Sequence, residues 1–403
     1  MLVHWLWYAL RTGMNNRDKL ALLERFQTAE DIFNATASDY FRAGLQKNAA
    51  AALQDKDLSQ AKQIMTECEE MGIGIVAFGD AQYPSRLKYI ADPPMVLYYK
   101  GKLPDFEKTA AVGVVGTRKA SLYGLQVAKR LGFQIGCCGG MVISGMAEGI
   151  DAYATKGALL AGGNVLGVLG SGVDMVYPTK NRPLFAEMER FGCLISEYPP
   201  GTPPYKWNFP QRNRIISGMS NGVLVVEAPE KSGALITARA ALEQGRDVFV
   251  VPGNIDVASC AGSNALLREG ATAVIHGWDI LSEYAAVYGG ALALRNIPEP
   301  AFDAEKPAPK VAQRPTLPAK KQEKTKKPID NGLNVAYSDK NDKLSGLSDG
   351  EQQLVRQLLE GERLVDDVIA GAGLNVAQAK AMLTMLEIKG VIASLPGGRL
   401  TLK

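Results

Sequence analysis

Histidine and paired cysteine are scarce in this chain. Its 403 residues include two histidines, His4 and His276, and five cysteines without any CxxC spacing. Structural zinc sites and disulfide frameworks need several such residues at close spacing, so neither is expected. A Ser-His-Asp or Cys-His catalytic set is equally disfavoured. We therefore expect no metal, no cofactor and no catalytic residue, and free thiols fit a cytoplasmic location.

A long apolar run and a strong net charge are also missing. No stretch approaches the ~20 apolar residues of a membrane helix. The opening MLVHWLWYALRTG lacks the basic start and the small-residue cleavage site of an export signal. We therefore expect a buried first helix and no membrane contact. The net charge of +3 does not by itself indicate nucleic acid, although a local basic face is compatible with it.

The order of apolar patterns predicts the domain organisation. With 46% hydrophobic residues, the chain can form two or three domains. Helical periodicity predicts a small helical domain over residues 1–75. Apolar strands then alternate with helices, which predicts an α/β domain over residues 76–290 with a doubly wound, mostly parallel sheet covered on both faces.

Two further segments follow the α/β domain. Residues 291–345 are rich in proline and lysine and poor in large apolar residues, which predicts a disordered linker. Residues 346–403 show three helical patterns and then two strands joined by PGG, which is the winged-helix pattern. Its third helix would be the recognition element, but the basic residues there are few: Lys380, Lys389 and Arg399. A protein contact or a packing role is as well supported as DNA reading.

Glycine and hydroxyl residues follow several predicted strands of the α/β domain. Examples are GTR at 116–118, SGMAEGID at 144–151, GSGVD at 170–174 and SGA at 232–234. These turns would share the carboxyl edge of the sheet, where open α/β folds bind ligands. Glycines let the backbone approach a ligand, and helix N-termini attract phosphate. Because GxGxxG and GxxxxGK[ST] are both missing, dinucleotide binding and P-loop ATP hydrolysis are disfavoured.

The segment FPQRNRIISG, residues 209–218, adds two arginines to this edge. If the chain is extended where it enters the following helix, Arg212 and Arg214 would point to the same side of the backbone. Their guanidinium groups could then bind phosphates bidentately. The preceding YKWNF alternates aromatic and basic residues, which suits the unstacked bases of a single strand. Alternatively, the two arginines pair with Glu197 and Glu227 inside the domain, which would not exclude binding. We expect the acidic residues of this edge to cap helices and to orient the arginines.

Together these motifs resemble the DNA-processing protein A family, also called Smf. The resemblance is strong over residues 80–285, where YPSRLKYIADPPMVLYYKG, VGVVGTR, SGMAEGID, LGSGVDMVYPTKN, FPQRNRIISG and VVEAPEKSGALITA follow in order. It implies an extended Rossmann-like domain between a helical (SAM-like) N-terminal domain and a C-terminal winged-helix domain. It also implies a non-enzymatic protein that binds single-stranded DNA during natural transformation, dimerises, protects the strand and helps to load the RecA recombinase.

The predicted DNA-binding residues are named on the matching motifs. They are Gly116, Thr117, Arg118, Ser144, Gly145, Lys180, Asn181, Lys206, Arg212, Asn213, Arg214, Ser232 and Gly233. Two positions depart from the family pattern. The family often has histidine where Thr155 stands, which argues against acid–base chemistry. It often has lysine directly after the Tyr-Pro pair, where this chain has Thr179 followed by Lys180.

Two other functions stay open, as does the dimer surface. The segment PGNIDVASCAGSN, residues 252–264, is superficially close to the phosphate loop of nucleotide-phosphate hydrolases with Rossmann-like folds, in which Glu227 or Asp174 could activate water. Alternatively, the chain is an adaptor whose winged helix is the main recognition module. We predict the dimer surface at residues 262–275, although a plain core helix explains the apolar pattern there equally well.

Overall fold

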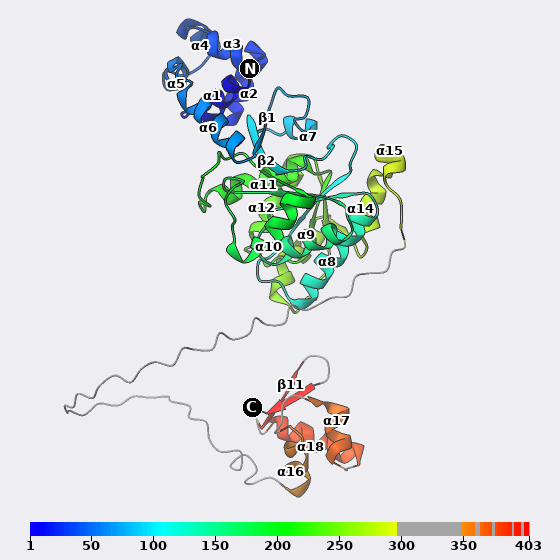
Figure 1. Cartoon of the computed structure of the whole chain (residues 1–403). Helices are drawn as coiled ribbons and strands as arrows, with labels where there is room; N and C mark the ends of the chain where they lie inside the picture. Colours follow the sequence, from blue (N-terminus) through cyan, green and yellow to red (C-terminus); the bar gives the residue numbers. More distant parts are fainter. Residues whose placement is uncertain (296–347, 359–362, 373–374, 389–390, 396–398, 403) are drawn as a thin grey trace, which may run out of the picture. The chain divides into compact units, whose positions relative to one another are not determined.

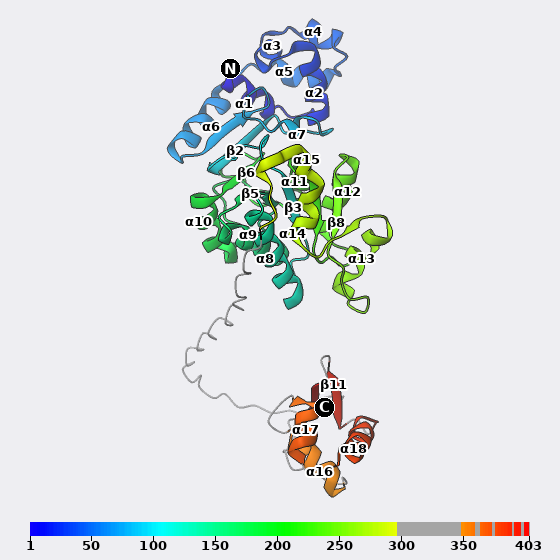
Figure 2. The same ribbon diagram turned by 90° about the vertical axis from the view of Figure 1, so that its right-hand side faces the viewer.

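The computed structural model describes residues 1–295, 348–358, 363–372, 375–388, 391–395 and 399–402. The chain divides into two compact units, Met1–Ala308 and Pro309–Lys403 (Figures 1 and 2). Most of the linker predicted for residues 291–345 lies outside the described residues. Within the described ranges, no helix has the length and apolar character that crossing a bilayer requires.

Six helices form one end of the first unit, beside strands β1 (Gly74–Ala77) and β2 (Val96–Gly101) (Figure 1). The side chains of Thr28 and Thr36 cap two of these helices. The buried side chains of the six helices share one hydrophobic core with the sheet, so the boundary at residue 75 stays a prediction. The helices are α1 (Leu2–Leu10), α2 (Asn16–Phe26), α3 (Ala29–Asn34), α4 (Ala37–Arg42), α5 (Lys47–Gln54) and α6 (Ser59–Glu70).

A nine-stranded sheet runs through the first unit in the order β1-β2-β6-β5-β4-β3-β7-β8-β9. Strands β1 and β2 pair antiparallel, as do β2 and β6. The other neighbouring pairs are parallel, which confirms the predicted doubly wound, mostly parallel sheet. The remaining strands are β3 (Ala111–Val115), β4 (Met141–Ser144), β5 (Asn164–Val168), β6 (Cys193–Ser196), β7 (Gly222–Val225), β8 (Asp247–Val250) and β9 (Thr272–Ala273).

Alternate side chains of β3 enter two separate hydrophobic cores, because successive residues of a strand point to opposite faces. Val112 and Val114 belong to one core, and Ala111 and Val115 belong to the other. The first face is covered by α8 (Leu122–Cys137), α9 (Ile150–Leu160), α10 (Arg182–Phe191) and α14 (Gly277–Leu281). The second is covered by α7 (Ser85–Lys88), α11 (Asn208–Met219), α12 (Gly233–Glu243) and α13 (Ala261–Arg268).

The strand order places a crevice beside β3. From β3 the chain adds β4, β5 and β6 on one side, and then returns to place β7 on the other side. The connections that follow β3 and β7 therefore diverge at the carboxyl ends of these two strands. Such switch points are where open α/β sheets bind ligands.

The second unit has the winged-helix pattern that the sequence predicts. Helices α16 (Asp349–Arg356), α17 (Val365–Ala372) and α18 (Val376–Ile388) precede the last two strands of a sheet ordered β10-β12-β11. Ser348 and Glu351 form a capping box at the start of the first of these helices. The strands are β10 (Arg363–Leu364), β11 (Ile392–Leu395) and β12 (Arg399–Leu402). Lys389 and the PGG turn lie outside the described residues.

Candidate nucleic-acid interface

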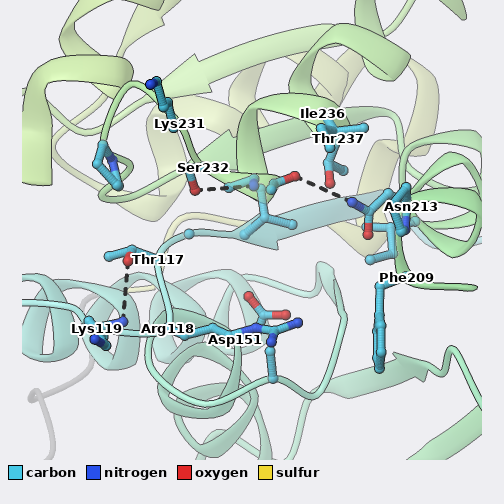
Figure 3. A pocket seen from close by; sticks show the side chains of 18 of the residues that line it. Thr117, Arg118, Lys119, Asp151, Phe209, Asn213, Lys231, Ser232, Ile236 and Thr237 are labelled. Atoms are coloured by element: carbon cyan, nitrogen blue, oxygen red, sulfur yellow. Dashed lines mark hydrogen bonds between the residues drawn. The ribbon is translucent and has the colours of Figure 1, made fainter. Parts of the chain in front are cut away.

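A cavity of about 580 Å³ opens at the switch point beside β3. Its walls come from the turns after β3 and β7 and from the first turns of α11 and α12 (Figure 3). The structure brings seven of the predicted DNA-binding residues to this cavity: Gly116, Thr117, Arg118, Arg212, Asn213, Ser232 and Gly233.

Hydrogen-bond donors and cations face each other across this cavity, which is the larger of two adjoining cavities. On one wall, the Ser232 side chain caps α12 by accepting from the N–H of Ala234 at 3.2 Å. That helix has 11 residues, and its N-terminal turn carries a partial positive charge. Lys231 lies on the same side, with Thr117 and Lys119 on the facing wall (Figure 3). The cavity therefore offers the donors that bind a phosphate.

A second cavity of about 240 Å³ adjoins the first, and the two share Arg118, Lys119, Ala147, Phe209 and Arg212. The Arg118 guanidinium carbon lies 5.5 Å from the centre of the Phe209 ring. The Tyr177 ring centre lies 5.5 Å from the same ring. Aromatic faces and guanidinium planes are the surfaces on which unpaired bases stack. The smaller cavity also receives the predicted Gly145.

Arg212 is a buried cation at the back of both cavities. It is 4% exposed, and one Nη donates to the carbonyl of Val168. Its Nε has no hydrogen-bond partner among the described residues. Burial lowers the pKa of Arg212 to about 10 against the attraction of Asp151, so Arg212 stays charged at neutral pH. Burial likewise raises the pKa of Asp151 against the pull of Arg212. The Asp151 carboxylate also accepts from the N–H of Gly145 at 3.0 Å.

Gly145 is needed where these two side chains meet. A Cβ atom added at this position would lie 2.6 Å from both Nη atoms of Arg212 and 2.6 Å from Oδ2 of Asp151. Only glycine leaves the pair in its place.

Arg214 does not line either cavity. Its guanidinium forms a bidentate pair with Glu197, at 3.0 and 2.6 Å, and its Nε donates to Asp92 at 2.9 Å. Burial alone would lower the pKa of Arg214, but Glu197 and Asp92 raise it overall. The alternative in which Arg214 pairs with Glu197 inside the domain is therefore confirmed. Direct DNA contact by Arg214 stays a prediction.

The predicted extended entry with both guanidinium groups on one side is wrong. Helix α11 begins at Asn208, so Arg212 and Arg214 both lie within it. Two residues apart on a helix with 3.6 residues per turn point in well-separated directions. The alternative pairing of an arginine with Glu227 is also wrong, because the Glu227 carboxylate accepts from the N–H and hydroxyl of Ser121 instead.

Two acidic residues of this edge, Glu227 and Asp174, are held by hydrogen bonds and not by the arginines that they were predicted to orient. Ser121, which Glu227 holds, is the N-cap of α8. Both carboxylate oxygens of Asp174 accept from the N–H of Gly201 at 3.0 Å. In the described part of the chain, no group of histidine, cysteine and acidic side chains could hold a metal ion.

The other predicted residues do not line the cavities. Ser144 is buried and donates to the carbonyl of Val114 at 2.8 Å. The Asn181 amide donates to the carbonyls of Met146 and Ala147. Lys180 is exposed and lies 3.6 Å from Glu148. Lys206 is exposed between Tyr205 and Trp207, whose rings stack at 4.7 Å.

The lining residues that the predicted set did not contain include two cations and an aromatic ring: Lys119, Lys231 and Phe209. The two lysines directly adjoin predicted residues, Arg118 and Ser232. A lysine in a turn is usually solvated, so the residue type alone did not predict a binding role. Only the position of each lysine beside a predicted residue could have indicated one.

Comparisons with known proteins agree with both units. The model of the family described as DNA recombination-mediator protein A matches residues 74–285, and that of the DprA winged helix domain matches residues 338–398. DNA processing protein DprA of Bacillus subtilis is 40% identical over 252 residues, which are 62% of this chain and 84% of that protein. Protein Smf of Synechocystis is 34% identical over 347 residues, 84% of this chain and 82% of that protein. The X-ray structure of DNA processing protein A from Streptococcus pneumoniae is 33% identical, with a TM-score of 0.63, and the match covers 70% of this chain and 98% of that one.

Proposed function

Because the chain belongs to the DNA recombination-mediator protein A family, we propose that it binds single-stranded DNA along the two adjoining cavities. One observation carries this proposal: cations, a helix N-terminus and an aromatic face line one crevice at the switch point of the sheet. A flexible single strand can present its phosphates and its unpaired bases separately to such a surface. A duplex keeps its base faces stacked.

The lining residues divide into two kinds of contact. Arg118, Lys119 and Lys231 are exposed and provide charge for the phosphates. Gly116 and Gly233 allow the backbone to approach, and the adjoining hydroxyl groups donate hydrogen bonds. Phe209 provides a ring on which one base stacks, an interaction worth ~1–3 kcal/mol.

Arg212 and Arg214 support the site in different ways. Arg212 directs its positive charge into both cavities from behind. Arg214 is a positioning residue, because its pairs with Glu197 and Asp92 fix α11 against the loops that precede it. Lys180, Asn181 and Lys206 lie at the margin, where they extend the binding surface.

We propose that the protein acts by binding and not by catalysis. Glu227 and Asp174, the candidate water-activating residues, are engaged by Ser121 and Gly201. Asp151 lies against the guanidinium of Arg212. Incubation with nucleoside monophosphates tests this view, since release of free base that depends on the protein would favour a nucleotide-phosphate hydrolase.

In the cell, we infer that the protein protects single strands that enter during natural transformation and helps to load RecA onto them. We also propose that it is cytoplasmic and forms a homodimer. Family membership supports these roles. Within the predicted dimer segment 262–275, Leu266 is buried, whereas Ile275 is 81% exposed and available to a second copy.

Fluorescence anisotropy with labelled oligonucleotides tests the central proposal. The full chain is titrated with single and double strands of one sequence at two salt concentrations. We expect tighter binding of the single strand, and a steep fall in affinity with salt because each bound phosphate releases counterions. Equal affinity for the duplex, or no dependence on salt, would contradict single-strand binding at these cavities.

A further inference from the structure

The two adjoining cavities differ in the charge of their walls. Both contain Arg118, Lys119 and Arg212. The larger one adds Lys231 and the N-terminus of α12, and its acidic residue, Asp151, is buried and attracted by Arg212. The smaller one has an accessible carboxylate, that of Glu148, in its wall. Glu148 offsets part of this shared positive charge in the smaller cavity, so a phosphate is favoured in the larger one.

Glu148 retains the capacity to accept hydrogen bonds. It stands in the loop between β4 and α9, and its side chain is 40% exposed. Its nearest cation, Lys180 Nζ, lies 3.6 Å away, which is too long for a hydrogen bond. Within the described residues, the Glu148 carboxylate makes this ion pair and no hydrogen bond. Its oxygens are thus available to donors on a ligand.

The rest of the smaller cavity suits a flat group with an aromatic face. Tyr177, Pro178 and Phe209 contribute apolar surface. Arg118 and Arg212 contribute planar guanidinium groups, and Lys119 adds a third cation. Its volume of about 240 Å³ lies below the ~300–1,000 Å³ of pockets that hold drug-sized ligands. The cavity therefore has the size and the walls to hold a small aromatic ring system.

We propose that the smaller cavity is a nucleobase subsite in which Glu148 accepts hydrogen bonds from the Watson–Crick edge of one unpaired base. This inference rests on the proposed binding of single-stranded DNA. It assigns the phosphates to the larger cavity and one base to the smaller, with Phe209 and Arg118 as the shared wall.

A carboxylate in this position discriminates among the four bases. Guanine offers two neighbouring donors, a ring N–H and an amino group, to the two oxygens of Glu148. Cytosine and adenine each offer an amino group. Thymine has no amino group, and its one N–H lies between two carbonyl oxygens that repel a carboxylate. The expected order of affinity is guanine first, cytosine and adenine next, and thymine last.

Anisotropy titrations of the full chain with oligo-dC and oligo-dT measure this discrimination, because the two pyrimidines differ little in stacking area. An oligo-dT with one central guanine is the third probe. We expect the parent to bind oligo-dC at least about fivefold more tightly than oligo-dT, as a base-edge contact normally provides. In Glu148→Gln this ratio should fall toward one, because an amide both donates and accepts and so also reads thymine.

Lys180→Gln is the matched control, since it removes the other charge of the same exposed ion pair. It should weaken binding of all three probes by one common factor and leave their ratios unchanged. If Glu148→Gln also shifts all probes equally, Glu148 acts only through its charge and base reading is refuted. A parent that binds oligo-dC and oligo-dT equally well refutes the subsite and leaves single-strand binding intact. A parent that binds none of the probes refutes both proposals.

Discussion

At the scale of single residues, Arg212 and Arg214 show how one motif serves two tasks. Both occupy α11, but Arg212 lines the cavities and Arg214 is held by Glu197 and Asp92. The residue types were readable from the sequence as anion-binding groups. Their separate directions were not, because these depend on where the helix begins.

Replacement of Arg214 by alanine tests its positioning role. The change leaves Glu197 largely buried without its cation, and breaking a buried ion pair costs about 3–5 kcal/mol. We expect the free energy of unfolding, measured in urea, to fall by an amount in that range. Gln211→Ala, an exposed change in the same helix, should have little effect. A folded Arg214→Ala protein with parental stability would rule out this role.

Arg118→Ala with Lys231→Ala tests the exposed cations. Both side chains line the larger cavity and neither forms a salt bridge within the described residues. We expect single-strand affinity to fall, and the slope of log affinity against log salt to decrease by about 1 for each phosphate that the variant no longer binds. The thermal unfolding midpoint should not change. Lys47→Ala changes an exposed lysine of α5 and should leave the affinity intact. A comparable loss of affinity in that variant would show that the protein's net charge, and not a local contact, causes the effect.

At the scale of helices and strands, the sequence predicted the alternating order but misplaced the start of α11. Apolar strand runs and helical periodicity are local signals, so the sheet could be read from them. Pro210 is compatible with the extended conformation predicted there, because proline disfavours a helical residue before it. It is tolerated in the first turn of α11, where its missing N–H would have no helical partner. Asn208 fixes that start by donating to the carbonyl of Gly170 at 2.9 Å, a contact that only the folded chain provides.

Ser232 at the start of α12 allows capping and ligand binding to be separated. Ser232→Ala removes the acceptor for the Ala234 N–H and should cost ~1 kcal/mol of stability. Ser232→Asp keeps a capping oxygen and should preserve stability, but its negative charge faces the cavity and should weaken DNA binding more than alanine does. Thermal unfolding and anisotropy should therefore rank the two variants in opposite orders. The same rank in both assays would place Ser232 outside the binding surface.

At the scale of the whole molecule, the sequence predicted both the α/β sheet and the winged-helix unit, but not the division of the site into two cavities. The division depends on Phe209 and Arg118, which reach the same place from α11 and from the turn after β3. No local sequence pattern predicts this contact between distant segments. The cores of the N-terminal helices and the sheet are likewise joined through long-range packing.

Truncation after residue 308 tests the role of the winged helix. All residues that line the two cavities belong to the first unit. We expect the shortened protein to retain single-strand affinity within about a factor of ten, since the phosphate contacts that dominate affinity are kept. Loss of binding in a folded truncated chain would support the adaptor hypothesis, in which the tail is the main recognition module.

The contribution of Lys19, in the N-terminal helices, to stability should rise with pH above 8. Burial, followed by the repulsion of Arg11, lowers its pKa from 10.5 to about 8. Between these two values the unfolded chain binds more protons than the folded one, so the free energy of unfolding increases with pH. In urea titrations from pH 7 to pH 10, Lys19→Met should be most stabilising at pH 7 and progressively less so above pH 8. A difference that stays constant over this pH range would contradict a depressed pKa of Lys19.

Gly145 also constrains the order in which this site can change by mutation. Any side chain there collides with the guanidinium of residue 212 and the carboxylate of residue 151. Alanine at 145 is therefore tolerable only in a background where one of those two has already become smaller. The effects of mutations at these three positions therefore depend on one another. Position 145 could change in evolution only after residue 212 or residue 151 had been replaced by a smaller one.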